Sequence, residues 1–540
     1  MVKSFENEFT YRKFLEAGKE NEFDRLFEEA VENVKKTIFG KTYSMYLGGK
    51  EVFSDQKFTE KSPIDGTIIG YFQKGTREHA RLAIKEARIA EEAWSKTNYK
   101  ERSAIFRKAA DIFSKNKFML GAILSYENGK SRYESIGEVD EAIDFMRYYA
   151  DELEANKGYL RKTVIKESTA KVNAGFQGAP STSTEKIVIR MQPFGVFGVL
   201  APFNFPLSIS VGMSTGAMIT GNTVIFKPSS DNMTMLTGLK IYELLTEAGL
   251  PAGVFNYLTG PGSEVGDELV ISKDVDGIVF TGSRLVGTKM ITKAYSLGLQ
   301  KMFVVEMGGK NPAIVSKNAD LDEAVKGIAS AAFGFDGQKC SACSRVYVHE
   351  SIKEQFISKL IEKTRSFKVG NPLNKEIYLG PLIGENAYKT YADAIEKLKQ
   401  SGKILYGGNK IDVGLSGFYV EPTIAEVKHE HELVKRELFV PVLLIEEFKD
   451  FEDAIRMAND VDYGLTSGLY SKNKKEINQY IEKIQAGVIY INRETSATTG
   501  AIVGMHTFVG WKGSSVGGKG TGSKYYLPQF MREQSVSVMQ

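Results

Sequence analysis

The sequence predicts an α/β protein in which two domains of alternating strands and helices follow a helical N-terminal region. Three observations support this fold class. Short apolar strands alternate with helices after Phe194, a pattern typical of a doubly wound parallel sheet. A similar alternation begins again after Cys340. The first part of the chain is instead polar, with apolar residues at helical spacing.

The first elements follow from local periodicity. We expect a polar helical stretch over 9–36, short strands over 46–53 and 67–72, and amphipathic helices over 78–95, 101–115 and 138–154. Residues 175–183 are rich in Gly, Ser, Ala and Pro, which indicates a loop at the tip of an extended arm.

The stretch between Arg190 and Lys227 contains no charged residue and is long enough to span a membrane. Pro193, Pro202 and Pro206 would break a spanning helix in its middle. We therefore interpret the stretch as a buried strand, a crossover helix and a second strand.

The two alternating regions account for most of the remaining chain, and no repeat of fixed period is visible. Expected strands of the first region cover 195–200, 222–226, 253–258, 277–280 and 302–305. The second region should contain strands over 346–349, 439–446 and 487–492, with helices over 353–368, 385–401 and 451–459. A Gly-rich tail over 504–523 precedes a final strand over 534–539.

Composition excludes several classes of protein. A length of 540 residues suggests two to four domains. The net charge of +3, with acidic and basic residues interspersed, does not indicate a nucleic acid or an acidic membrane as a partner. Two cysteines form no disulfide framework, and residues 1–6 lack the apolar core of a signal peptide. We expect a cytoplasmic protein.

Two motifs place a thiol and a carboxylate in the segment between the domains. Cys340 lies in Gly-Gln-Lys-Cys-Ser at 337–341, and Glu306 begins Glu-Met-Gly-Gly-Lys. A nucleophile and a base brought together by the fold perform covalent catalysis at carbonyls. A buried inert cysteine is the alternative for Cys340. A zinc site with Cys343 would need about four ligands, and the nearest histidine, His349, has no companion, so we predict no metal and interpret Cys343 as a packing residue.

Two further motifs suit carbonyl and dinucleotide chemistry. Asn204 lies between two prolines in Pro-Phe-Asn-Phe-Pro, where a rigid amide donor can stabilise an oxyanion. An asparagine that only forms a turn is the alternative. Residues 280–287 place Gly-Ser between an expected strand and a helix, a junction that aims N–H groups at a pyrophosphate. Residues 260–266 lack the Gly-x-Gly-x-x-Gly spacing and are interpreted as a turn lining the adenine side.

These ordered motifs resemble those of the NAD(P)-dependent aldehyde dehydrogenase superfamily, from about Tyr46 to the C-terminus. The resemblance implies a Rossmann-like cofactor domain, an α/β catalytic domain and a small β oligomerisation arm. It implies that Cys340 adds to the aldehyde to give a thiohemiacetal. Asn204 and the Cys340 N–H would hold the oxyanion, and Glu306 would activate the water that hydrolyses the thioester.

The resemblance also implies cofactor-binding residues. Lys227 would contact the adenosine ribose, Gly262 would line the adenine side, and Gly282 with Ser283 would hold the pyrophosphate. Many NAD-specific members carry a Glu at the position of Ser230, where it repels a 2′-phosphate. We therefore expect either NAD or NADP.

A third motif of the superfamily concerns the nicotinamide side. Glu437 would hold the nicotinamide ribose and Phe439 would wall the ring. Val440 replaces the usual Gly of this motif, a departure that could shift the loop.

Other segments are similar to 1-pyrroline-5-carboxylate dehydrogenases: residues 333–345, Glu-Ala-Ile-Asp-Phe at 141–145, the helical N-terminal extension and Thr-Gly-Ala at 499–501. This similarity implies oxidation of L-glutamate γ-semialdehyde, formed from 1-pyrroline-5-carboxylate, to L-glutamate in the second step of proline degradation. Another semialdehyde or a sugar-derived aldehyde is the alternative substrate. A non-catalytic binding protein on the same fold is the other alternative.

The implied substrate contacts suit an amino-acid aldehyde. The N–H groups of Gly500 and Ala501 and the hydroxyl of Ser341 would bind the α-carboxylate, and Gly permits close approach. Phe205 and Phe508 would pack the methylene chain. Glu141 is a candidate contact near the polar end of the substrate, with a salt-bridged helix carboxylate as the alternative. The family's Pro-Phe-Gly-Gly appears here as Thr-Phe-Val-Gly at 507–510, which leaves fine substrate preference open.

The expected domain boundaries follow from the motifs. Residues 1–165 form the N-terminal extension and the first part of the cofactor domain, 166–187 the arm, 188–305 the cofactor domain, 306–510 the catalytic domain and 511–540 the tail with its oligomerisation strand. The family precedent implies a homo-oligomer, a dimer or a multiple of dimers, because exposed arm strands need a partner.

Overall fold

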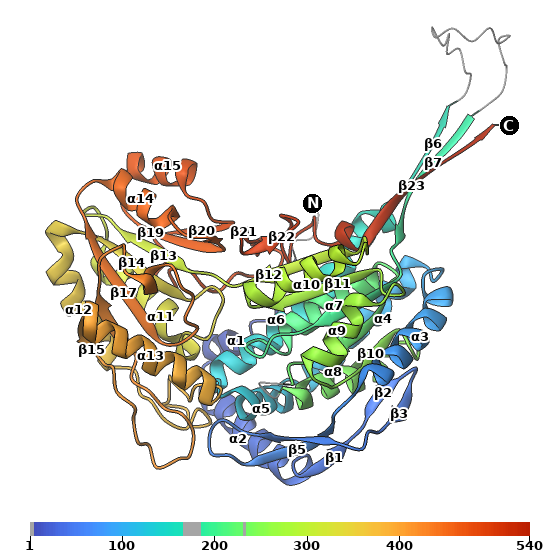
Figure 1. The fold of residues 1–540 in the computed structure, drawn as a ribbon, viewed down its shortest axis with the longest axis horizontal. Helices are drawn as coiled ribbons and strands as arrows, with labels where there is room; N and C mark the ends of the chain where they lie inside the picture. Colours follow the sequence, from blue (N-terminus) through green and yellow to red (C-terminus); the bar gives the residue numbers. More distant parts are fainter. Residues whose placement is uncertain (1–4, 166–184, 231–233, 540) are drawn as a thin grey trace, which may run out of the picture.

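Two large sheets organise residues 5–165, 185–230 and 234–539, which the computed structural model describes (Figure 1). The first has eight strands in the order β22-β12-β11-β8-β9-β10-β2-β3. Its central strands run parallel: β8 (Val196–Leu200), β9 (Thr223–Lys227), β10 (Phe255–Tyr257), β11 (Gly277–Gly282) and β12 (Met302–Met307). All residues of β8 and β9 are buried, as expected for a parallel sheet covered on both faces.

Alternate residues of these strands enter different cores because successive side chains point to opposite faces. Val199 and Val224 pack in one core with α4, α6, α7 and α8, whereas Val196 and Ile225 pack in another with α3, α9 and α10. The helices are α3 (Arg77–Trp94), α4 (Tyr99–Lys115), α6 (Arg132–Ala155), α7 (Ser208–Ile219), α8 (Met235–Glu247), α9 (Asp267–Ile271) and α10 (Arg284–Ser296). The uncharged stretch is therefore β8, α7 and β9, as predicted.

The second sheet has seven strands in the order β15-β16-β17-β14-β13-β19-β20. They are β13 (Asn311–Val315), β14 (Cys343–His349), β15 (Lys403–Tyr406), β16 (Thr423–Glu426), β17 (Val442–Phe448), β19 (Thr466–Tyr470) and β20 (Val488–Ile491). The flanking helices are α11 (Leu321–Phe333), α12 (Lys353–Arg365), α13 (Glu385–Ser401), α14 (Phe451–Asn459) and α15 (Lys474–Lys483). The two sheets confirm the α/β fold class.

The N-terminal part differs in places from the prediction. The stretch expected as one strand over 46–53 is a hairpin of β2 (Met45–Leu47) and β3 (Lys50–Val52), because Gly48 and Gly49 adopt positive φ and turn the chain. The helix α5 (Lys117–Asn128) was not predicted. The remaining elements here are α1 (Thr10–Glu16), α2 (Glu20–Thr37), β1 (Lys41–Tyr43), β4 (Lys57–Lys61) and β5 (Ile68–Gln73).

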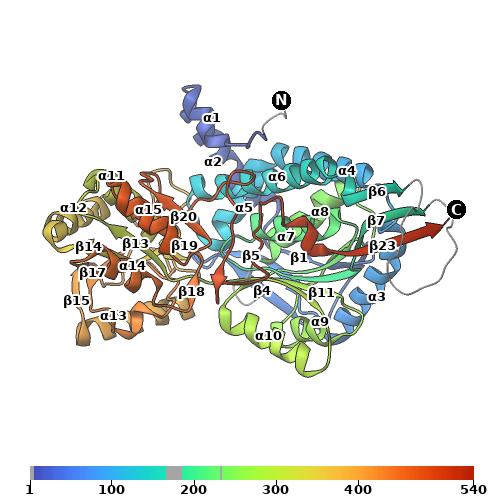
Figure 2. The ribbon, with the colours of Figure 1, turned by 90° about the horizontal axis from the view of Figure 1, so that it is seen from above.

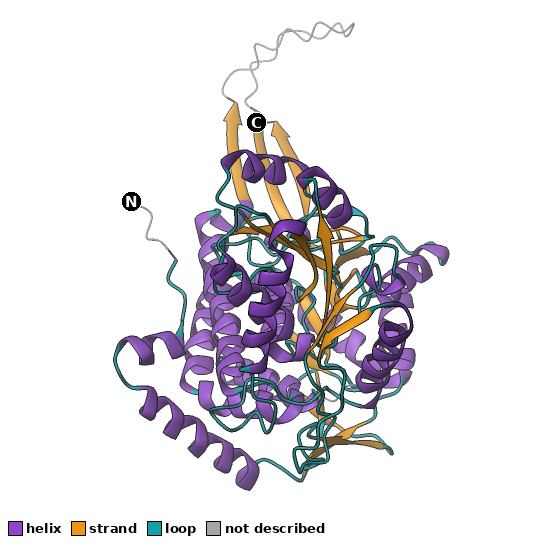
Figure 3. Cartoon of the chain, turned by 90° about the vertical axis from the view of Figure 1, so that its left-hand side faces the viewer, coloured by secondary structure: helices purple, strands orange, loops and turns teal. Residues whose placement is uncertain are grey.

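Three antiparallel strands project from the body beside the first sheet (Figure 3). They are β6 (Leu160–Ile165), β7 (Glu185–Pro193) and β23 (Met531–Met539), in the order β23-β7-β6. The final strand predicted over 534–539 is thus part of β23. The loop predicted over 175–183, and all but 185–187 of the predicted arm, lie outside the described residues.

The tail connects the two halves of the molecule, which lie side by side in Figure 2. Its strand β21 (Trp511–Lys512) pairs with β18 (Tyr463–Gly464), and β22 (Ser515–Val516) pairs with Val305 and Glu306 of β12. Among the helices of the described residues, none combines the length and the apolar character needed to cross a bilayer.

Candidate active site

The loop that carries Cys340 runs from α11 to β14 in a constrained conformation. Phe335 has a φ of 53°, an uncommon value for a bulky residue. The Gln338 side chain accepts the Ile383 N–H at 2.9 Å, and Asn311 Nδ2 donates to the Cys340 carbonyl at 2.8 Å. These bonds fix the backbone on both sides of the half-buried thiol.

Glu306 lies near the end of β12, close enough for its charge to act on the Cys340 thiol. Burial raises the pKa of that thiol to about 12, the charges of Glu437 and Glu306 raise it as well, and the Ser341 amide lowers it. The Glu306 Oε2 atom is buried and has no hydrogen-bond partner in the described residues, and burial raises its pKa well above the usual range. The structure therefore brings the predicted nucleophile and base together, and burial favours the protonated form of each.

The loop that carries Asn204 lies between β8 and α7, and Asn204 is 4% exposed. The ring of the preceding Phe203 packs edge-on against Phe439, with centroids 5.8 Å apart. Glu437, two residues before Phe439, accepts the Gly309 N–H at 2.7 Å, and burial raises the pKa of Glu437 to about 7. The Asn204 loop, the turn after Glu306 and the Glu437 loop thus meet around one site.

The proposed cofactor residues follow the carboxyl ends of parallel strands. Lys227 ends β9, Gly262 follows β10, Gly282 ends β11 and Ser283 caps α10. Ligands of open α/β sheets bind along this edge. The first turn of α10 contains no acidic residue, so its positive dipole end is free to attract a pyrophosphate. This donor set fits a dinucleotide.

Ser230 occupies a buried position at the adenosine side of this edge. Its hydroxyl donates to the Gly260 carbonyl at 2.9 Å, and the Gly260 N–H lies 3.3 Å from the same oxygen. The serine therefore ties two loops together and carries no charge that would repel a 2′-phosphate.

Comparison with known proteins identifies the family of this chain. Residues 52–536 match the sequence profile described as Aldehyde dehydrogenase family. The chain belongs to the aldehyde dehydrogenase family. A relative from Anoxybacillus flavithermus, named 1-pyrroline-5-carboxylate dehydrogenase, is 36% identical over 545 residues and covers 100% of both chains. One from Geobacillus sp. (strain WCH70), with the same name, is 37% identical over 95% of this chain and 96% of its own.

Solved structures of aldehyde dehydrogenases and related proteins show the same fold. The 1-pyrroline-5-carboxylate dehydrogenase from Thermus with bound NAD has a TM-score of 0.88 and 32% identity, covering 100% of this chain and 99% of that chain. Proline utilization A from Bdellovibrio bacteriovorus has a TM-score of 0.89 and 33% identity; this chain spans about half of it, 53%.

The residues proposed to bind substrate in this aldehyde dehydrogenase come from several loops. Thr498 Oγ1 donates to the Ser341 carbonyl at 2.7 Å, which ties the loop of Gly500 and Ala501 to the residue after the nucleophile. Phe508 lies in a β-bridge with Thr521. Phe508 and Phe205 form no aromatic ring pair in the described residues, so their packing around the methylene chain of the substrate stays a prediction.

Glu141 lies on α6, and burial raises its pKa to about 7. No ion pair joins Glu141 to another described residue, and the buried ion pair of this helix joins Glu138 to Lys130. Both of these side chains are 0% exposed. Neither was predicted, although the spacing of Glu134, Glu138 and Glu141 on one helical face was a signal that they share partners.

The Lys130–Glu138 pair contacts the catalytic loops. Glu138 accepts the Leu207 and Ser208 N–H groups at 2.8 and 3.2 Å, at the start of the helix that follows Asn204. The Lys130 ammonium lies 3.6 Å from the ring centroid of Phe205 and 4.8 Å from that of Phe335. The pair therefore connects the Asn204 loop with the Cys340 loop.

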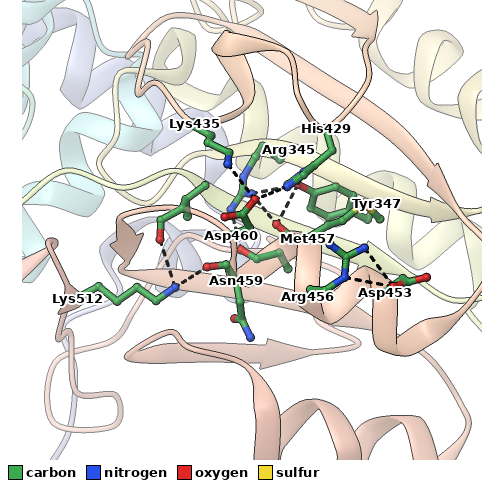
Figure 4. Close-up of polar contacts among 12 residues, drawn as sticks. Arg345, Tyr347, His429, Lys435, Asp453, Arg456, Met457, Asn459, Asp460 and Lys512 are labelled. Carbon is green, nitrogen blue, oxygen red and sulfur yellow. Dashed lines mark hydrogen bonds and ion pairs between the residues drawn. The ribbon is translucent and has the colours of Figure 1, made fainter.

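A second buried network fixes the end of the turn after Glu306. Arg345 donates two hydrogen bonds to the Lys310 carbonyl, at 2.9 and 2.7 Å, and one to the Tyr347 hydroxyl at 3.0 Å. Tyr347 contacts His429, which in turn contacts Asp460 at 2.9 Å (Figure 4). These residues are far apart in the sequence, and no motif predicted their contact.

Proposed function

We propose that this aldehyde dehydrogenase oxidises L-glutamate γ-semialdehyde, the open form of 1-pyrroline-5-carboxylate, to L-glutamate with NAD or NADP. The observation that carries the proposal is the meeting of Cys340 and Glu306 next to a loop with the Thr-Gly-Ala sequence of 499–501. The full-length relatives named 1-pyrroline-5-carboxylate dehydrogenase support it. The reaction is the second step of proline degradation.

The first step is addition of sulfur to the carbonyl carbon. Cys340 must lose its proton, because the thiolate is the nucleophile, and burial keeps the resting group protonated. Addition converts the aldehyde into a thiohemiacetal whose oxygen carries the developing negative charge. The Asn204 amide and the Cys340 N–H donate hydrogen bonds to that oxygen.

The bound cofactor supplies the acceptor for the hydride that leaves the thiohemiacetal carbon. Lys227, Gly262, Gly282 and Ser283 would hold its adenosine and pyrophosphate parts at the sheet edge. Glu437 and Phe439 would orient its nicotinamide side. Loss of hydride converts the thiohemiacetal into a thioester on Cys340.

Hydrolysis of that thioester needs a base. Glu306 takes a proton from water, and the hydroxide equivalent attacks the acyl carbon and releases glutamate and the thiolate. A carboxyl group with a raised pKa is a stronger base than an ordinary one, and burial gives Glu306 this property.

Substrate recognition rests on the remote end of the aldehyde. The Gly500 and Ala501 N–H groups and the Ser341 hydroxyl would bind the α-carboxylate. Glu141, on the helix beneath, would face the ammonium group, and Phe205 with Phe508 would flank the methylenes between the two ends.

A steady-state assay tests the proposal. The full chain is mixed with 1-pyrroline-5-carboxylate and either NAD+ or NADP+, and reduced cofactor is followed by absorbance. We expect turnover that Cys340→Ala abolishes. Propionaldehyde, succinate semialdehyde and lactaldehyde are tested separately as alternative substrates. Lactaldehyde is included because a lactaldehyde dehydrogenase structure is also similar, with a TM-score of 0.83 and 29% identity over 92% of this chain. Equal kcat/KM for simple aldehydes, or equal turnover by the variant, would contradict the proposal.

We further propose that the protein acts in the cytoplasm as a homo-oligomer. The support is the three-stranded arm, whose outer strands β6 and β23 each have one edge without a partner strand in the described residues. An exposed edge of this kind pairs readily with another chain.

A further inference from the structure

The amides of Gly500 and Ala501 are two consecutive donors without an acceptor. In the described part of the chain neither donates a hydrogen bond. The amides on both sides of them do: Thr499 N–H donates to a serine hydroxyl at 3.0 Å and Ile502 N–H to a histidine nitrogen at 3.1 Å. Successive free N–H groups form a concavity that binds anions.

The carbonyl groups of the same two peptides are held by one side chain. Arg493 Nη1 donates to the Thr499 carbonyl at 2.9 Å, and Nη2 donates to the Gly500 carbonyl at 2.7 Å. In a planar trans peptide the carbonyl and the N–H point in opposite directions. By holding both carbonyls on its own side, Arg493 turns the Gly500 and Ala501 N–H groups to the other side.

Arg493 is itself held in place. Its guanidinium carbon lies 4.5 Å from the ring centroid of Tyr490, and its backbone carbonyl accepts the Tyr470 hydroxyl at 2.8 Å. The preceding Asn492 exchanges two hydrogen bonds of 2.8 Å with Ser471. These contacts fix both the guanidinium group of Arg493 and the backbone that carries it after the end of β20.

The positive charge of Arg493 also favours anion binding by the Gly500 and Ala501 N–H groups, in addition to the orientation that its hydrogen bonds impose. A guanidinium remains charged at all physiological pH values, and a hydrogen bond to a carbonyl polarises the peptide and strengthens its N–H as a donor. Thr498 fixes the same loop to the Ser341 carbonyl. The loop thus presents its donors at a set distance from the thiol.

We propose that Arg493 is a positioning residue that selects aldehydes with a carboxylate at the end remote from the reacting carbon. It does so by orienting and polarising the two peptides whose N–H groups bind that carboxylate. The inference rests on the proposed function. It adds the residue that makes the loop of residues 499–501, the anchor loop, specific for substrates with a carboxylate.

The test compares Arg493→Met, Arg493→Lys and the unmodified chain. The substrates are 1-pyrroline-5-carboxylate and propionaldehyde, which has no carboxylate, and glutamate is used as a product inhibitor. For Arg493→Met we expect the KM for 1-pyrroline-5-carboxylate and the inhibition constant for glutamate to rise ~10-fold, as for loss of a charged hydrogen-bond donor. The kcat/KM for propionaldehyde should stay within about twofold, and Arg493→Lys, which keeps the charge, should recover part of the loss.

Lys326→Met is the matched control, because Lys326 pairs with Glu494, the neighbour of Arg493, and its loss removes a positive charge without touching the anchor loop. Equal losses on both substrates, or no change in Arg493→Met, would overturn the positioning role. An unmodified chain that oxidises propionaldehyde but not 1-pyrroline-5-carboxylate would instead overturn the proposed function.

Discussion

Burial opposes ionisation of both reacting side chains in this site. It raises the pKa of the Cys340 thiol and of the Glu306 carboxyl, so each group keeps its proton more firmly than it would in water. A protonated thiol protects the nucleophile from side reactions, because the thiolate is the reactive form. The carboxylate of a group with a raised pKa is also a stronger base than an ordinary carboxylate.

The role of Glu306 predicts a specific kinetic defect. In Glu306→Gln the carboxylate that activates water is missing, while Cys340 still adds to the aldehyde. We expect a first turnover of reduced cofactor that remains visible as a burst, followed by a steady state ~10²–10⁴ times slower. Rapid mixing with 1-pyrroline-5-carboxylate measures both phases. Loss of the burst together with the steady state would show that Glu306 acts before the thioester forms.

The same substitution predicts a change in stability with pH. The pKa of Glu306 is raised in the folded state, so the unfolded chain gives up its proton first as pH rises, and this group makes folding less favourable above its unfolded pKa of about 4.3. Glu306→Gln should therefore melt at a higher temperature than the unmodified chain at pH 8, and the difference should shrink toward pH 4. A pH-independent difference in melting temperature would argue against a raised pKa.

At the scale of elements, helix α6 organises the site. On one face of α6, Glu134 forms an ion pair with Lys339, which precedes the nucleophile, and Glu138 forms one with Lys130. The other face receives the N-terminal segment: Asp144 accepts the Asn7 side chain at 2.8 Å, and the same side chain reaches the Val503 carbonyl at 3.1 Å. The N-terminal extension, α6 and the loop after Ala501 are therefore packed as one unit.

This arrangement predicts coupling between Lys130 and Asn204. Lys130→Met leaves Glu138 as a buried charge without its partner, which typically costs ~3–5 kcal/mol, and shifts the start of α7 behind Asn204. We expect kcat to fall ~10-fold or more. Because both changes impair the same oxyanion contact, Lys130→Met/Asn204→Ala should be scarcely slower than Asn204→Ala alone. The measurement is kcat for the two single variants and the double variant.

Arg102→Met is the control for that cycle. Arg102 donates to the Ile219 carbonyl at 2.8 Å, at the opposite end of α7, and is also buried. Its loss should destabilise the same helix without affecting Asn204, so its effect should multiply with that of Asn204→Ala. Multiplicative effects for Lys130→Met would contradict the coupling, and Lys130→Arg provides a charged variant if Lys130→Met does not fold.

Individual elements differ in how far the sequence predicts them. The bounds of α13 and α14 agree with the prediction, because each has an apolar stripe with a polar opposite face. Helix α5 was missed because nine consecutive residues, 120–128, are buried whether apolar or polar, so no alternation of an apolar and a polar face reveals a helical period. The hairpin over Met45–Val52 was missed because its strands are only three residues long.

At the scale of the whole molecule, strands from residues 511–539 join elements that are distant in the sequence. The arm joins β6 and β7 to the last strand, β23, and the tail strands β21 and β22 each pair with a different half of the molecule. The site is therefore assembled from loops of both large sheets and from the tail.

The arm predicts the state of assembly. Removal of residues 533–540 takes away most of β23, which pairs with β7 along its full length. We expect light scattering to give the full chain a mass of at least two subunits and to show fewer subunits per particle for the shortened chain. A monomeric full chain, or an unchanged mass after truncation, would contradict the proposed homo-oligomer.

The motifs predicted the parts of the site that depend on residue type, such as a thiol after Gly-Gln-Lys and an amide between two prolines. Contacts that support these parts could not be predicted, because they join residues distant in sequence with no pattern of their own. Lys130 with Phe335 and Arg345 with Lys310 are examples. Arg493 lies only seven residues before Gly500 in the sequence. Its contact with the Gly500 carbonyl could still not be predicted, because it depends on how the intervening loop folds back.

The pairing of β22 with β12 has a consequence for synthesis of the protein. Ser515 lies opposite Glu306, and the Ser514 carbonyl accepts the Met307 N–H at 2.7 Å. A nascent polypeptide cannot form these contacts while residues 514–516 are still inside the ribosome. We expect such chains to be enzymatically silent, so that aldehyde oxidation begins only after this segment has emerged and paired with β12.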